Sequence, residues 1–262
     1  MRIRVTAAAV ATVGGVLALT AFAGPAEAAT ATTANTAPVI SKVVVNGGKP
    51  VVLGTTGAKK LSVSVTASDD SGIQDAAGLL YDGATPDAAN DVTYVMNEKK
   101  ATCKASGTTA AVCTFTITAD PGELWNTDAR TWHVGAAALG KDKGVTEKDT
   151  FSTIAFQRAS KLTTDAAPEP VKKGGTLTVT GRLSRANWDT GTYAGYTTQP
   201  VRLQFRKAGS SAYTTVTTLK TSSTGTLKTT VKASVDGYWH YSFVGTSTTP
   251  AVSAAGDYVD VR

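Results

Sequence analysis

The chain has 262 residues, of which 42% are hydrophobic, and a formal net charge of +6. This length accommodates one or two domains. Threonine, alanine, valine, glycine and serine are abundant whereas glutamate is scarce, a balance that favours sheets over helices and predicts an all-β protein.

Residues 1–28 have the pattern of a secretory signal peptide. Arg2 and Arg4 precede an apolar run over 5–23, and a small-x-small cleavage pattern ends at Ala28. We therefore predict cleavage after Ala28 and a protein that is secreted into the medium or loosely retained in the cell wall. No later apolar run approaches the roughly 20 residues of a membrane span, so no span is expected in the mature protein.

The first half of the mature chain predicts one β-sandwich. Residues 29–37 lack apolar periodicity and predict a flexible leader. Within 38–157, apolar and polar side chains alternate in about seven short segments separated by turn residues. The expected strands are 39–45, 61–67, 79–81, 92–96, 113–117, 132–138 and 151–156.

Cys103 and Cys113 are the two cysteines of the chain, and both lie in this half. Export would place them in an oxidising compartment, where such a pair normally forms a disulfide. A metal site needs more ligands than two thiols, and a redox pair usually has C-x-x-C spacing. We predict a structural disulfide that closes a hairpin whose turn lies within 104–112.

Residues 158–262 predict a second sandwich of about seven strands. The expected strands are 161–163, 177–179, 201–205, 213–219, 227–231, 239–243 and 259–261. Residues 29–157 carry a net charge of −2 and residues 158–262 one of +7. The basic half could attract anionic polymers, or its lysines and arginines could serve solubility on the polar strand faces.

Both halves resemble secreted proteins of Streptomyces-type actinobacteria that carry bacterial Ig-like domains. The resemblance rests on the run 169–181, on Val201–Lys207, on Asp236–Trp239 and on 245–261, and in the first half on 41–48 and Thr131–Val134. It implies two tandem Ig-like antiparallel β-sandwiches and a protein of unknown function. Some relatives are labelled calcium-binding, and the family offers no catalytic residue to transfer.

Catalysis is not expected from the sequence. His133 and His240 are the only two histidines, and each alternates with apolar neighbours, which places it on the outward face of a strand. No nucleophile elbow, zinc-protease motif or cysteine–histidine arrangement is present. We therefore predict a non-enzymatic protein that needs no cofactor.

Calcium is the sharpest alternative to a purely structural role. Asp69, Asp70 and Asp75 cluster after a predicted strand, and exported modules often bind calcium through loop carboxylates. The EF-hand spacing fails because Ile73 occupies a ligand position. Aspartates are also ordinary turn formers, so the two interpretations stay open.

Carbohydrate binding is a further alternative. Residues 186–200 predict a long loop that holds Trp188, Tyr193 and Tyr196, which could stack on sugars or fold back to cap the core. The lysines are scattered and no recognition helix is apparent, so specific nucleic-acid binding is not expected. The sequence favours a structural or adhesive protein that contacts an extracellular protein or an anionic or glycan polymer.

Overall fold

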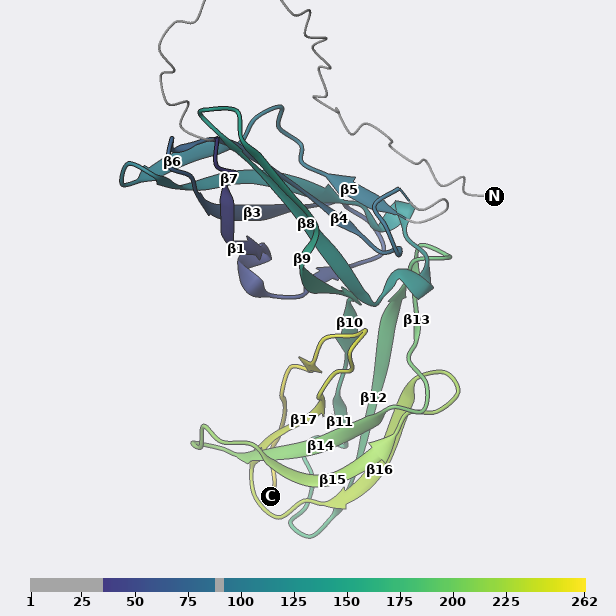
Figure 1. Ribbon diagram of the computed structural model, residues 1–262. Coiled ribbons are helices and arrows are strands. Elements are labelled where there is room, and N and C mark those ends of the chain that lie inside the picture. Colours follow the sequence, from purple (N-terminus) through teal and green to yellow (C-terminus); the bar gives the residue numbers. More distant parts are fainter. Residues whose placement is uncertain (1–34, 88–91) are drawn as a thin grey trace, which may run out of the picture. The chain divides into compact units, whose positions relative to one another are not determined.

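The computed structural model describes residues 35–87 and 92–262 (Figure 1). Nearly all of its regular structure is strand, which confirms the predicted all-β class. Helical geometry is limited in these ranges to the 3₁₀ turns η1 (Asn46–Gly48), η2 (Pro121–Glu123) and η3 (Asn126–Asp128). The predicted signal peptide and most of the predicted leader lie outside the described residues. No helix in the described part is long and apolar enough to cross a bilayer.

The strands belong to four sheets. Two come from the first part of the chain, in the orders β1-β3-β7-β6 and β2-β9-β8-β4-β5. Their strands are β1 (Val39–Val45), β2 (Val51–Leu53), β3 (Lys59–Ser68), β4 (Ile73–Tyr81), β5 (Thr93–Val95), β6 (Thr102–Ser106), β7 (Ala110–Ala119), β8 (Thr131–Gly140) and β9 (Val145–Arg158). β1 with β3, β6 with β7, and β4 with both β5 and β8 pair antiparallel, whereas β2 and β9 run parallel.

The other two sheets follow in the sequence. One has the order β10-β12-β11 with β13 and β16 also paired to β12, and the other has the order β15-β14-β17-β18 with β19 also paired to β17. Their strands are β10 (Ser160–Leu162), β11 (Asp165–Ala167), β12 (Thr176–Asn187), β13 (Thr192–Gly195), β14 (Pro200–Lys207), β15 (Thr214–Lys220), β16 (Thr226–Lys232), β17 (Gly237–Phe243), β18 (Val252–Ser253) and β19 (Asp257–Val259).

The chain divides into two compact units that are each discontinuous in sequence. Among the described residues, the first unit comprises 35–47, 62–87, 92–117 and 133–152, and the second comprises 48–61, 118–132 and 153–262. Two early segments of the chain therefore group with its C-terminal part. The single boundary near residue 158 that the sequence suggests stays a prediction.

In the first unit, two sheets pack face to face. Val63 and Val65 of β3, and Phe115 and Ile117 of β7, point inward at every second position and are buried. The Phe115 ring lies against β4 at Gly78, where a Cβ atom would come within 2.9 Å of it. Glycine is needed here because the opposite sheet approaches so closely.

In the second unit, β12 and β17 face each other across the core. Leu177, Val179 and Leu183 of β12 are buried, as are the inward-facing residues of β17. The Tyr241 hydroxyl donates a hydrogen bond to the Val179 carbonyl at 3.0 Å. This bond joins the two sheets and explains how a buried phenol is tolerated.

The second unit also contains a polar cluster around Asn126. The side chain of Asn126 donates to Asn187 and Asp189, and it accepts hydrogen bonds from the Trp188 amide and the Arg158 guanidinium. Arg158 is buried, and this burial lowers its pKa to about 10. The cluster ties residues 118–132 to β9 and β12 inside this unit.

The structure corrects two details of the predicted strands. β4 starts at Ile73 rather than residue 79, so the stretch that precedes Leu79 is strand as well. The long loop expected over 186–200 is mostly a hairpin, because β12 continues to Asn187 and its last residues pair with β13. The hairpin turn expected within 104–112 is confined to the residues between β6 and β7.

Candidate metal centre

Three carboxylates converge where β3, β4, β8 and β9 begin or end. Asp69 and Asp70 lie in the turn between β3 and β4, and Asp142 lies in the turn between β8 and β9. The start of β4 pairs with the end of β8, Ile73 opposite Gly140, and this register brings the two turns together. One oxygen from each of the three carboxylates lies within 4.8 Å of the others.

Asp69 is the buried member of this group, with 6% of its surface exposed. Its Oδ1 accepts hydrogen bonds from the amide and the hydroxyl of Ser71. Its Oδ2 is buried and has no hydrogen-bond partner. A buried carboxylate oxygen without a partner costs free energy, and a cation bound at this point would remove that cost.

Asp70 and Asp142 complete the group from the exposed side. Asp70 Oδ1 accepts hydrogen bonds from the Thr36 hydroxyl at 2.7 Å and the Ser71 amide at 3.0 Å. The Thr36 bond, supported by the Ser71 amide, lowers the pKa of Asp70, so this group stays ionised. Asp142 Oδ1 accepts from the Gly144 amide at 3.0 Å.

Further oxygens gather around two glycines of the β8–β9 turn. A Cβ atom on Gly140 would lie 2.6 Å from Asp142 Oδ1 and 3.0 Å from Asp69 Oδ1. A Cβ atom on Gly144 would lie 2.7 Å from both Asn35 Oδ1 and the Thr36 carbonyl oxygen. At either position, only a residue without a side chain leaves room for these closely spaced oxygen atoms.

The donor set fits a hard divalent cation. Its three acidic ligands offer only oxygen, and the neighbouring amide and carbonyl oxygens of residues 35 and 36 are further candidates. Calcium takes six to eight oxygen ligands in flexible geometry, whereas zinc favours histidine and cysteine. Asp69, Asp70 and Asp142 would therefore hold Ca²⁺ in preference to a softer metal.

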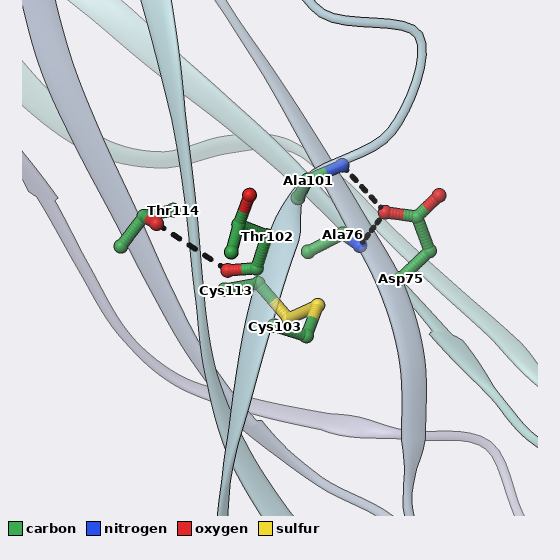
Figure 2. Close-up of a disulfide and its surroundings, with 7 residues drawn as sticks. All are labelled: Asp75, Ala76, Ala101, Thr102, Cys103, Cys113 and Thr114. Carbon is green, nitrogen blue, oxygen red and sulfur yellow. Dashed lines mark hydrogen bonds between the residues drawn. A yellow bond between two sulfur atoms is a disulfide. The ribbon is translucent and has the colours of Figure 1, made fainter.

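Asp75, the third aspartate suggested by the sequence, has a different position. Figure 2 shows its Oδ1 accepting hydrogen bonds from the Ala76 and Ala101 amides, at 2.8 and 2.9 Å. It fixes the chain just before β6. Asp142 is the member of the carboxylate group that sequence reasoning missed, since its turn is remote in sequence and has ordinary turn composition.

The predicted disulfide is present and lies beside Asp75 (Figure 2). Cys103 of β6 and Cys113 of β7 are directly opposite each other in the hairpin ladder. Cys113 is fully buried, and the Thr114 hydroxyl donates to the Thr102 carbonyl on the neighbouring strand. The bond therefore pins an edge strand to the interior of its sheet.

The three aromatic residues proposed as a sugar-binding loop lie in other surroundings. Trp188 is 0% exposed, and its indole nitrogen donates to the Gly54 carbonyl at 2.8 Å within the second unit. The Tyr193 ring is covered by the Lys161 ammonium and the Tyr196 ring by the Arg185 guanidinium, each at 3.9 Å. Trp188 thus follows the capping interpretation, and a cation lies over one face of each of the two tyrosine rings.

Neither histidine stands in an open catalytic arrangement. The His133 ring stacks on Tyr81, with 4.9 Å between centroids. The His240 ring lies on the outward side of β17, as expected, but Tyr213 stacks over it at 3.8 Å and leaves it 8% exposed. Burial lowers the pKa of His240, so this ring is neutral at pH 7.

Comparison with known protein families gives a match to only part of the chain. Residues 52–138 match DUF5707, a family of unknown function. No curated protein matches the chain.

Solved structures resemble the chain at low identity. The D00-D0 domain of intimin is 14% identical, with 83% of this chain and 99% of that one covered and a TM-score of 0.28. A marsupial T cell receptor is 12% identical over 85% and 72% of the two chains, with a TM-score of 0.36. Latent PorU from Porphyromonas gingivalis is 13% identical over 87% of this chain, with a TM-score of 0.29, and the match covers only 20% of PorU.

Proposed function

We propose that the protein is a secreted, non-enzymatic β-sandwich module in which one calcium ion binds Asp69, Asp70 and Asp142. The observation that carries this proposal is that Asp69, a member of the group of three carboxylates, has a buried Oδ2 without a hydrogen-bond partner. Aspartates that only form turns accept hydrogen bonds from nearby backbone amides, as Asp69 Oδ1 does from Ser71, and this role does not account for the buried Oδ2.

A cation at this position would act as a brace. Its two positive charges would offset most of the charge of three carboxylates held within 4.8 Å of one another, whose mutual repulsion otherwise opposes folding. It would also join the turn at 69–71, the turn at 140–144 and the segment at 35–36, which already touch through Thr36 and Asn35. The expected benefit is a stiffer edge of the first unit.

A role outside the cell and without catalysis has separate support. The signal-peptide pattern at 1–28 and the Cys103–Cys113 bond both fit an oxidising compartment. The two histidines are engaged in ring stacks rather than presented to a substrate. We propose that the module serves as a structural or adhesive element through contacts with a protein or an envelope polymer.

Thermal unfolding with calcium and with EDTA tests the proposal. A ligand at 100 times its dissociation constant stabilises the folded state by about 2.7 kcal/mol. For a chain of this size that corresponds to a rise in midpoint of about 5–10 °C. Magnesium serves as a second cation, and we expect it to stabilise less because it requires stricter octahedral geometry.

Two substitutions sharpen the test. Asp142→Asn removes a charge from the site and is expected to abolish the calcium-dependent rise, whereas Asp149→Asn removes an exposed charge from β9 and should leave it intact. Isothermal titration of both variants measures binding directly. A midpoint that does not change across millimolar calcium, together with no heat of binding, would overturn the proposal.

A further inference from the structure

The outward face of the sheet β15-β14-β17 in the second unit carries a continuous row of flat side chains. The row consists of Tyr213, Arg206, Tyr238 and Tyr258, and we call it the tyrosine row. Arg206 lies opposite Tyr238 in the ladder, and Tyr238 lies opposite Tyr258. The guanidinium carbon of Arg206 is 5.2 Å from the Tyr213 ring centroid and 4.1 Å from that of Tyr238.

The row is held in place from below and from the side. Trp239, Tyr241 and Phe243 alternate with it along β17 and are buried in the core, so Tyr238 must face outward. Tyr213 stacks on His240, which bonds to Gln204 Oε1 at 2.9 Å. Arg206 donates to the Ser210 carbonyl and so fixes the loop that carries Tyr213. These contacts pre-organise the row before any ligand binds.

This face differs from the outward face of the other sheet in the same unit. There, Thr178 of β12 lies opposite Thr230 of β16, and the positions on either side pair threonine with lysine. That is the ordinary pattern for a solvated sheet. The opposite side of the unit instead carries three tyrosines, of which Tyr258 is 41% exposed. Neither solubility nor the packing of the core requires tyrosines at these positions.

A polar row runs parallel to the tyrosine row. Arg202 of β14 lies opposite Ser242 of β17, which in turn lies opposite Ser253 of β18, and the two serine hydroxyls are 2.9 Å apart. Four residues along a strand separate Arg202 from Arg206, or about 13 Å. The face therefore offers stacking surfaces at one edge and hydrogen-bonding groups at the other. A sugar chain has matching chemistry, with apolar ring faces and peripheral hydroxyls.

The charge of this face selects among sugars. Residues 158–262 carry a net charge of +7, and Arg202 and Arg206 both project from the outward side of β14. Three aspartates lie near the Tyr258 end of the row: Asp260 pairs with Arg262, whereas Asp257 and Asp236 accept hydrogen bonds from the Ala166 and Val261 amides. Their charges act near Tyr258, so a carboxylate would bind at the arginines of β14. Guanidinium groups bind carboxylates well, so an acidic ligand fits best.

We propose that this face binds carboxylated polysaccharides, with the tyrosines stacking on sugar rings and Arg202 and Arg206 pairing with carboxylates. The inference names a ligand class for the contact role proposed above and rests on that role, but not on the calcium site. A proline-rich peptide could also pack against the tyrosines. It has no side-chain groups that would pair with Arg202, Ser242 and Ser253.

Affinity electrophoresis with two soluble polymers on the same glucan backbone tests the inference. Carboxymethyl cellulose supplies the acidic groups and hydroxyethyl cellulose is the neutral counterpart. We expect the wild-type protein to be retarded by the first polymer at least tenfold more strongly than by the second. Equal retardation by both polymers, or none by either, would overturn the proposal.

Matched variants locate the binding face. Tyr258→Ala and Arg202→Gln should each weaken retardation by about tenfold, equivalent to about 1.4 kcal/mol. Lys228→Gln removes the same charge from the outward face of β16 and should change it less than twofold. If Lys228→Gln weakens binding as much as Arg202→Gln, attraction is general and the proposed face is wrong. Tyr258→Phe keeps the ring and should bind normally, which separates stacking from misfolding.

Two further arms keep the inference separate from the calcium proposal and from peptide binding. Retardation measured in EDTA should be the same for the wild type and for Asp142→Asn, because the tyrosine row and the three aspartates belong to different units. If carboxymethyl cellulose does not retard the wild-type protein while calcium still raises its thermal midpoint, the polysaccharide inference is overturned and the calcium proposal stands. Stronger binding of a proline-rich peptide than of carboxymethyl cellulose, abolished by Tyr258→Ala, would assign the face to peptides instead.

Discussion

Replacing Tyr241 with phenylalanine should destabilise the protein at neutral pH and stabilise it at strongly alkaline pH. The Tyr241 side chain is 0% exposed, its hydroxyl donates to the Val179 carbonyl, and burial raises its pKa to about 12. At pH 7, Tyr241→Phe removes one buried hydrogen bond and should lower the free energy of unfolding by about 1 kcal/mol. The ring remains, so no large cavity forms.

At alkaline pH the wild-type protein should lose this advantage. The unfolded phenol ionises near pH 10, whereas the folded one resists ionisation up to about pH 12. Between these values the unfolded state binds fewer protons than the folded state, so stability falls as pH rises. The loss is about 1.4 kcal/mol at pH 11 and approaches about 2.7 kcal/mol above pH 12.

The phenylalanine variant has no phenol at this position and avoids that loss. It should therefore be less stable than the wild type at pH 7, nearly equal in stability close to pH 11 and more stable above it. Urea unfolding followed by tryptophan fluorescence at several pH values measures the difference, in which the other tyrosines and the lysines cancel. A stability gap that stays constant from pH 7 to pH 11.5 would refute the reasoning.

Substitutions at three other features of the structure test the packing. Breaking the disulfide with Cys103→Ser and Cys113→Ser together should cost about 2–4 kcal/mol in urea unfolding, and a reducing agent should reproduce the loss in the wild type. Trp188→Ala should cost about 3–5 kcal/mol, and Trp188→Phe clearly less; similar losses would argue against burial as the cause. Gly181→Ala should cost more than about 2 kcal/mol, because its Cβ atom would meet the Thr163 carbonyl and lie 2.6 Å from the Tyr241 ring; an unchanged thermal midpoint would contradict this packing.

The strands that sequence reasoning identified are those with clear alternation. Residues 61–67 and 227–231 show it over several positions, and both lie in strands of the structure. β2, β13 and β18 have two to four residues and show no clear alternation, and none of them is among the predicted strands. The predicted strand 79–81 covers only the end of β4, and Gly78, which directly precedes it, lets the Phe115 ring approach.

The sequence predicted only the part of the candidate site that lies within one turn. Asp69 and Asp70 are adjacent in sequence, and the turn that carries them is visible in the residue pattern. Asp142 joins them only through the register of β4 with β8, which sequence periodicity does not specify. Likewise, the tyrosine row combines residues from β14, β17 and β19 with Tyr213 beside β15, and it emerges only once these strands are paired.

The position of the disulfide has a consequence for oxidative folding. The chain has two cysteines, so a single intramolecular pairing exists and no isomerase is needed to correct a wrong one. The two thiols face each other in one hairpin, which can form in microseconds and before sheets assembled from distant segments. Oxidation of this hairpin can thus precede the rest of the fold, and the nearness of the two thiols keeps intermolecular cross-links from competing.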